Sequence, residues 1–307
     1  MIEATEISTK NENDRSSEIE ARLLTIQRFI TRIPSFSTTV AKVLEICSSR
    51  DAAAGDLNRV ISYDPVLTGQ LIKLINSAYY GLPNRVTSLT RAIIMLGINT
   101  VKNMVLSTSV LARFKSRLKV STLTIDDFWQ HSLGVAVIAK AIAKRLQVPL
   151  DEQEEYFVAG LMHDLGKIPL INCYPELYQQ ALNAAKDSRL TLLQAEISAI
   201  GIDHCQVGYL IGAKWKLVDQ VQAAIIAHHQ PTVDLHGVDV RIWCIISLAN
   251  QLAKLFSIGS SGDADIDSNL AGSLAEHIGI DFNALARMKS DIEVEIEKAR
   301  IFLQVAA

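Results

Sequence analysis

The chain has few of the residues that would tie it to an oxidising compartment or a membrane. Its 307 residues include four cysteines, which lie far apart and form no C-x-x-C pair: Cys47, Cys173, Cys205 and Cys244. We interpret them as reduced thiols, because disulfide frameworks and zinc ribbons use closely spaced cysteines. No apolar run reaches the roughly 18 residues that cross a bilayer. The polar first 15 residues lack the basic and apolar regions of a signal peptide. We therefore expect a soluble, cytoplasmic protein with no membrane partner.

The chain also lacks a surplus of positive charge. Lys and Arg total 30 and Asp and Glu total 33, so the formal net charge is −3. A dedicated duplex-binding protein needs excess cations to displace counterions from phosphates. Two basic clusters, Arg113–Arg117 and Lys140 with Lys144-Arg145, are explained equally well by solvated helix faces. We do not expect a nucleic-acid partner.

Strand-like alternation and internal repeats are absent as well, and apolar residues recur at helical spacing along nearly the whole chain. The fold class is therefore predicted to be all-α, a multi-helix bundle with an N-terminal helical subdomain. Ser17–Glu20 resembles a capping box that begins the first helix, and Asp64-Pro65 and Thr124 or Asp126 begin later ones. Further helices are predicted near residues 175–187, 190–200, 204–213, 217–229, 239–257 and 281–304.

These signals divide the chain into four parts. We predict a flexible N-terminus over residues 1–16, an N-terminal helical half over 17–115, a second half over 124–230, and C-terminal helices over 231–307 that complete the bundle. The boundary falls at Lys115–Thr124, which is basic and weakly periodic. The Gly-, Ser- and Asp-rich segment Ser257–Ser268 is predicted to be a mobile loop.

Histidines concentrate in the second half. Five of the seven lie between residues 131 and 229, and one of them is followed directly by an aspartate. Imidazoles with a carboxylate suit borderline divalent cations, so we predict a site for Fe or Mn, with Zn or Mg as alternatives. The predicted ligands are His131, His163, Asp164, His204, His228 and His229. A single histidine on a helix is more often a surface or core residue, so the prediction depends on the set.

Two of these ligand positions are adjacent pairs. Consecutive helical residues point about 100° apart, so His163-Asp164 and His228-His229 cannot each chelate one ion side by side. Each pair either spans two ions or supplies one ligand and one group that orients a ligand.

The order His131, His163-Asp164 within H-D-L-G-K, and then further histidines resembles the HD superfamily of metal phosphohydrolases. The chain is more similar still to the HDOD branch, a bacterial regulatory family related to HD-GYP proteins. The matching segments run from about residue 30 to 230: Asp64-Pro65-Val66-Leu67, Leu71–Ala78, Leu96-Gly97, Trp129, Asp203-His204, Trp215 and His228-His229. The resemblance implies signal transduction through a protein partner or a small-molecule or nucleotide ligand. It also implies that Lys167 can contact phosphate, which would make Asp164 and Lys167 the catalytic pair of an active relative.

Two departures from these patterns bear on activity. HD hydrolases close their site with a later Asp, and Asn250 stands at the corresponding position. A neutral amide is a weaker ligand, so we favour one ion or a weakly occupied pair. Glu196 either adds a carboxylate or is a solvated helix residue. The Gly-Tyr-Pro that follows the histidine pair in HD-GYP proteins is absent, which disfavours cyclic dinucleotide hydrolysis. The prediction is thus a regulatory protein without robust catalysis; the alternative is a metal-dependent phosphohydrolase or phosphodiesterase acting on a nucleotide.

Overall fold

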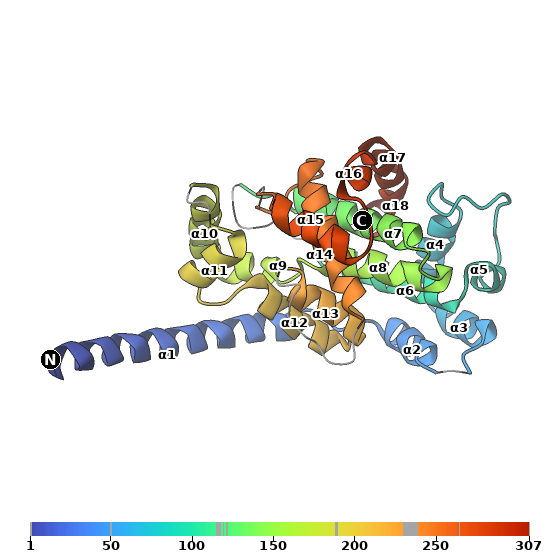
Figure 1. Ribbon diagram of the computed structural model, residues 1–307. Helices are drawn as coiled ribbons and strands as arrows, with labels where there is room; N and C mark the ends of the chain where they lie inside the picture. The colour runs from blue at the N-terminus through green and yellow to red at the C-terminus, as the bar shows by residue number, and fades with distance from the viewer. Residues whose placement is uncertain are drawn as a thin grey trace.

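The computed structural model describes residues 2–49, 51–114, 118, 120, 122–187, 190–229, 239–263 and 265–306. Within these ranges the chain forms helices joined by loops, with no β-strand, which confirms the all-α prediction (Figure 1). No single helix of this part of the chain has the length and apolar character to cross a membrane. The bent pair α5 (Leu89–Leu96) and α6 (Ile98–Leu111) has the required length and apolar character only when the two helices are taken together.

The helices of the N-terminal half are α1 (Ile2–Arg32), α2 (Thr38–Cys47), α3 (Ala54–Ile61), α4 (Pro65–Ile75), α5 (Leu89–Leu96) and α6 (Ile98–Leu111). The predicted start at Asp64-Pro65 is confirmed, because Asp64 Oδ1 accepts a hydrogen bond from the amide of Leu67 at 2.9 Å. Of the basic cluster Arg113–Arg117, residues 115–117 lie outside the described residues, as does most of the predicted boundary segment.

The first helix begins earlier than its sequence suggests. We expected a capping box at Ser17, but α1 is continuous from Ile2 to Arg32 and extends away from the bundle (Figure 1). The flexibility expected of residues 1–16 stays a prediction. Ser17 lies inside the helix, where amides bond to carbonyls four residues earlier, so a capping box has no free amide to satisfy. The C-terminal part of α1 packs on the bundle through buried Ile26 and Ile30.

The second half contains the long helix α7 and a series of shorter ones: α7 (Ile125–Arg145), α8 (Leu150–Met162), α9 (Lys167–Cys173), α10 (Pro175–Asp187), α11 (Leu192–Ala199), α12 (His204–Trp215) and α13 (Asp219–Ala227). Thr124, one of the two predicted caps, accepts a hydrogen bond from the amide of Asp127 at 3.0 Å. The turn at residues 163–166 separates α8 from α9, and the sequence did not indicate α9.

The C-terminal helices pack on both halves. They are α14 (Val240–Leu255), α15 (Ser268–His277), α16 (Phe282–Ala286), α17 (Lys289–Ala299) and α18 (Ile301–Ala306). α14 and α17 lie against α7, whereas α18 lies against α4 and α6. The single helix predicted over 281–304 is therefore wrong, because the chain breaks into three helices there. The last break turns Phe302 into the core, where its ring centroid is 4.9 Å from that of Phe157.

The predicted mobile loop between α14 and α15 is in fact bound to the core. Lys254 Nζ donates to Asp263 Oδ2 at 2.6 Å, and the Ser260 amide donates to the Asp127 carbonyl at 3.0 Å. The carbonyl of Ser261 accepts a hydrogen bond from the buried ammonium of Lys167 at 3.1 Å. Glycine and serine are small enough for this packing, and the hydrogen bonds and the ion pair hold the loop in place.

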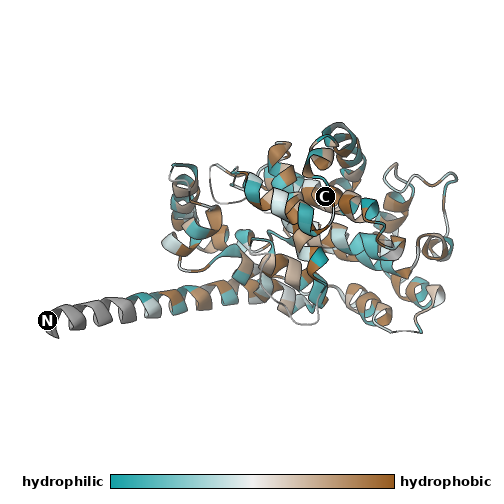
Figure 2. Cartoon of the chain, viewed as in Figure 1, coloured by the Kyte–Doolittle hydropathy of each residue, from teal (hydrophilic) through white to brown (hydrophobic). Residues whose placement is uncertain are grey.

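Close helix contacts bring the predicted ligands together. A Cβ on Gly160 would lie 2.7 Å from Ala136 Cα, so only glycine lets α8 pack this closely on α7. A Cβ on Gly166 would lie 1.9 Å from the His204 carbonyl oxygen, so the turn after α8 touches the start of α12. One continuous hydrophobic core surrounds these contacts. Most helices carry both hydrophobic and hydrophilic residues, as expected of amphipathic helices (Figure 2).

Candidate metal centre

Asp164 lies at the centre of the predicted site, in the turn between α8 and α9, and its two oxygens face two sets of histidines. Asp164 Oδ2 is 3.3 Å from His163 Nε2 and 4.0 Å from His131 Nε2, which comes from α7. One ligand atom from each of these three residues lies within 4.8 Å of the others. We call His131, His163 and Asp164 the His131 group.

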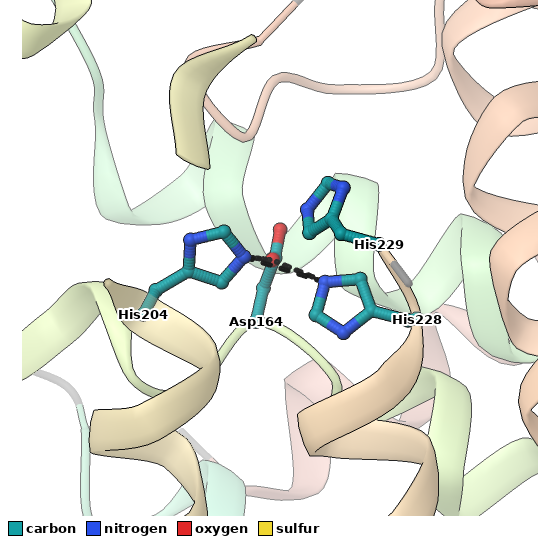
Figure 3. Close-up of side chains that lie close together, drawn as sticks. All are labelled: Asp164, His204, His228 and His229. Carbon is teal, nitrogen blue, oxygen red and sulfur yellow. Dashed lines mark hydrogen bonds and ion pairs between the residues drawn. The ribbon is translucent and has the colours of Figure 1, made fainter. Parts of the chain in front are cut away.

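The other oxygen faces the remaining predicted ligands. Asp164 Oδ1 is 3.4 Å from His204 Nε2 at the start of α12 and 3.6 Å from His228 Nε2 just after α13 (Figure 3). His229 completes a second set whose ligand atoms also lie within 4.8 Å of one another. We call Asp164, His204, His228 and His229 the His204 group. All six predicted ligands therefore converge, and Asp164 belongs to both groups.

Backbone carbonyls orient two of the imidazoles. His163 Nδ1 donates to the Gly160 carbonyl at 2.7 Å, and His228 Nδ1 donates to the Ile225 carbonyl at 2.9 Å. A carbonyl only accepts hydrogen bonds, so each Nδ1 carries the proton. Each Nε2 is then the ring nitrogen directed toward Asp164, and it is the atom that would bind a metal.

A buried carboxylate orients the third imidazole. Glu196 Oε2 accepts hydrogen bonds from His204 Nδ1 at 2.6 Å and from the His204 amide at 2.9 Å, and Glu196 Oε1 accepts one from the Tyr178 hydroxyl at 3.0 Å. Glu196 is fully buried, so it is not the solvated helix residue that we considered. It also does not act as a ligand, because its carboxylate is hydrogen-bonded to His204 on the side away from Asp164. Burial alone would lower the pKa of His204, but the Glu196 carboxylate raises it well above its ordinary value. The sequence signal for this role was weak: one acid in the otherwise apolar stretch of α11.

Burial keeps three of the histidines neutral. It lowers the pKa of His131 to about 3, with a smaller contribution from His163. It also lowers the pKa of His163 and, to well below its ordinary value, that of His229. A neutral imidazole is the form that binds a cation, so these side chains need lose no proton to become ligands.

The remaining groups of the centre carry charge. Burial opposes ionisation of Asp164, but His163 and Lys167 lower its pKa well below the ordinary value. Burial likewise opposes the charge on His228, but Cys205 and Asp164 raise its pKa to about 9. No sequence signal indicated this role for Cys205, whose Sγ lies 3.9 Å from His228 Nδ1. Burial disfavours the Cys205 thiolate, but His228 and His204 lower its pKa to about 7.

Two further residues lie against the His131 group. Lys167 Nζ is 2.8 Å from Asp164 Oδ2, and the lysine is only 2% exposed. This placement differs from the phosphate-contacting lysine that the family resemblance implied. Asn250 of α14 lies where the closing acid was expected, and its Oδ1 accepts a hydrogen bond from His131 Nε2 at 3.1 Å.

The donor atoms of the cluster fit a divalent cation. His163 Nε2, Asp164 Oδ1 and His229 Nε2 are buried and have no hydrogen-bond partner. Buried polar atoms without partners are rare because they lose their bonds to water, and an unplaced ion is one accepted explanation for them. An imidazole-rich set with one carboxylate suits Fe, Mn or Zn better than Mg, which prefers oxygen ligands.

Comparison with known proteins identifies the family. A family model described as the HDOD domain matches residues 33–231, well over half of the chain. The chain belongs to the HDOD domain family. The predicted resemblance is thereby confirmed, and the matched range includes every residue of both ligand groups.

Solved structures of low sequence identity share the fold. An HDOD domain protein of unknown function from Geobacter sulfurreducens is 24% identical, with a TM-score of 0.72 over 92% of this chain and 98% of its own. A candidate phosphohydrolase from Shewanella amazonensis SB2B is 21% identical, with a TM-score of 0.69 over 91% and 98% of the two chains. A candidate signal-transduction protein from Marinobacter aquaeolei VT8 is 19% identical, with a TM-score of 0.70 over 94% and 66%.

A curated relative is longer than this chain. An uncharacterized protein of Treponema pallidum (strain Nichols) is 26% identical over 206 residues, which make up 65% of this chain and 38% of the relative. The chain thus matches well under half of that protein's length.

Proposed function

We propose that this HDOD protein is a regulatory signal-transduction protein whose His/Asp centre binds a divalent cation, Mn²⁺ or Fe²⁺, without robust turnover. Its input would come from a protein partner or from a small-molecule or nucleotide ligand. The observation that carries this proposal is the enclosure of the centre. His163, Asp164 and His204 are 0% exposed, and His131 and His228 are 1% exposed. Among the six predicted ligands only His229 is partly exposed, so within the described residues the ligands offer little surface to a phosphoester.

The chemistry of the centre supports the same function. Metal-assisted phosphoryl transfer needs a cation that activates water and further positive groups directed at the phosphate. The one lysine of H-D-L-G-K is instead buried against Asp164 and the Ser261 carbonyl. Asn250 adds no negative charge to help hold a second ion. The centre therefore favours binding over hydrolysis.

A metal-dependent phosphohydrolase is the second candidate, and the position of Asp164 favours it. Its two oxygens face two separate ligand groups, as in sites that hold a pair of ions. A bound cation would supply an activated water, and Asp164 would orient it. Lys167 would have to leave the Ser261 carbonyl to reach a phosphate.

Elemental analysis together with a turnover assay tests the proposal. Protein purified without chelator, and protein reconstituted anaerobically with Mn²⁺ or Fe²⁺, would be offered nucleoside phosphates, cyclic nucleotides and cyclic dinucleotides. We expect bound metal and no metal-dependent phosphate release. Robust turnover that disappears in His163→Ala would establish the phosphohydrolase instead. Failure of the wild-type protein to bind any divalent metal would overturn both functions.

A further inference from the structure

We infer that the ammonium of Lys167 takes the place of a second metal ion at the His131 group, so that the centre holds one divalent cation, in the His204 group. The inference rests on the proposed function, because it assumes that the centre binds a metal. It adds the number of ions, their position and the residue that sets both.

The first observation is where the ammonium lies. Lys167 Nζ is 2.8 Å from Asp164 Oδ2, the same oxygen that faces His163 Nε2 at 3.3 Å and His131 Nε2 at 4.0 Å. At 2% exposure the lysine is shielded from bulk water, and a buried charge is stable only when it is paired. Asp164 is that pair, so one positive charge is already built into this side of the carboxylate.

The second observation is that His131 is also engaged. Its Nε2 donates to Asn250 Oδ1 at 3.1 Å, and a protonated ring nitrogen has no lone pair for a metal. Of the two imidazoles in the His131 group, only that of His163 has an Nε2 without a hydrogen-bond partner. One free imidazole nitrogen is a weak basis for a metal site when the shared carboxylate oxygen is already paired.

The opposite oxygen has no ammonium beside it. The two Nε2 atoms that it faces, those of His204 and His228, are hydrogen-bonded to each other at 3.3 Å, so one proton must leave before both bind a cation. Asp164 Oδ1 accepts no hydrogen bond, and it faces the Nε2 atoms of His204 and His228 at 3.4 and 3.6 Å. His229 Nε2, in the same group, is buried and unpartnered. The His204 group therefore offers one carboxylate oxygen and three imidazoles, a complete set for one cation.

The charge of the centre gives the physical reason. Asp164 is the only carboxylate in the two ligand groups, and Glu196 adds one more negative charge behind His204. One divalent ion and the Lys167 ammonium bring three positive charges against these two negative ones. A second divalent ion would raise that to five against two, in a buried setting where like charges strongly disfavour one another.

The position of Lys167 is also built into the fold. Its second acceptor, the Ser261 carbonyl, lies in the loop that the Lys254–Asp263 ion pair and the Ser260 amide bind to the core. The ammonium is thus held between two fixed acceptors.

Counting Mn²⁺ per chain tests the inference. The full chain, stripped of metal, would be titrated with Mn²⁺ and assayed by elemental analysis and by electron paramagnetic resonance. We expect one Mn²⁺ per wild-type chain, with the six-line signal of an isolated ion. In Lys167→Met the count should rise to two, with the broadened signal of ions coupled through Asp164. Lys167→Gln, which keeps hydrogen-bond donors without charge, is the second variant in case the methionine variant fails to fold.

Lys140→Met is the matched control. It removes another lysine from a largely buried ion pair, but one that pairs with Glu154 rather than Asp164 and does not touch the Ser261 loop, so its count should stay at one. Two ions in the wild-type chain, or one ion in both folded Lys167 variants, would overturn the inference while leaving metal binding intact. A wild-type chain that binds no Mn²⁺ would instead overturn the proposed function, and the inference with it.

Discussion

The carboxylate of Glu196 provides a sharp test of how the centre is held together. In Glu196→Gln, a neutral amide replaces the carboxylate that accepts both the Nδ1 and the amide hydrogen bonds of His204. Such outer groups fix the ring orientation and raise the basicity of the ligand nitrogen. Their loss typically lowers metal affinity by about 10- to 100-fold, or about 1.4–2.7 kcal/mol. We expect a loss of Mn²⁺ affinity within this range.

The size of the loss should depend on pH. Glu196 stabilises any positive charge on His204, whether it comes from a proton or from a metal, and it raises the pKa of His204 well above the ordinary value. In the wild-type chain the proton therefore competes with the metal at neutral pH, and the substitution weakens both. Proton competition weakens as pH rises, so the ratio of variant to wild-type Kd should be larger at pH 8.5 than at pH 7.

The assay is anaerobic calorimetric titration with Mn²⁺ at the two pH values, with circular dichroism to establish folding. Glu176→Gln makes the same chemical change at an exposed site on α10 and should leave the Kd unchanged. Tyr178→Phe removes one hydrogen bond to Glu196 but keeps the carboxylate, so this variant should lose less Mn²⁺ affinity than Glu196→Gln. A folded Glu196→Gln chain with wild-type Kd at both pH values would refute the role of Glu196.

Three further predictions follow from the same geometry. Asp164→Asn removes the carboxylate shared by both groups, so bound Mn²⁺ should fall to background by elemental analysis; retention of half the wild-type metal would contradict the shared position. Burial lowers the pKa of His131 to about 3, whereas in the unfolded chain its pKa is about 6.5. Below about pH 6.5 the unfolded chain of the metal-free protein therefore binds a proton that the folded protein does not, and the free energy of unfolding falls. Urea titrations should show a loss from this residue of about 1.4 kcal/mol per pH unit below that pH, absent in His131→Asn; equal slopes would refute the assignment. Gly166→Ala places a Cβ 1.9 Å from the His204 carbonyl and should destabilise the fold by about 3 kcal/mol, whereas Gly69→Ala, with nothing within 4 Å, should stabilise it by about 0.5–1 kcal/mol; similar melting shifts would contradict the packing argument.

Local signals in the sequence predicted most of the helices. Asp64 and Thr124 cap the helices that they were expected to begin, because a cap depends on hydrogen bonds within one turn. The capping box predicted at Ser17 was wrong for a related reason. The same residue types occur both at the start of a helix and inside one, and here α1 continues on the N-terminal side of Ser17. The mobile loop was wrong because its anchors, Lys167 and Asp127, are far away in the chain.

The motif order likewise predicted which residues lie together in the candidate metal centre, but not how each of them is placed there. Spacing along the chain indicates that His131, His163 and His228 belong together, since the family pattern records which residues meet. It does not record which oxygen of Asp164 each one faces, or that Lys167 occupies one side.

Composition and periodicity thus predict an all-α chain, and the ordered histidines indicate a candidate cation centre and the family. The roles of Lys167, Asn250 and Glu196 follow only from three-dimensional packing. Each depends on a hydrogen bond or ion pair whose strength is set by burial and by distances of about 3 Å. Burial and distance arise when helices remote in the chain pack together, so no local pattern of residues encodes them.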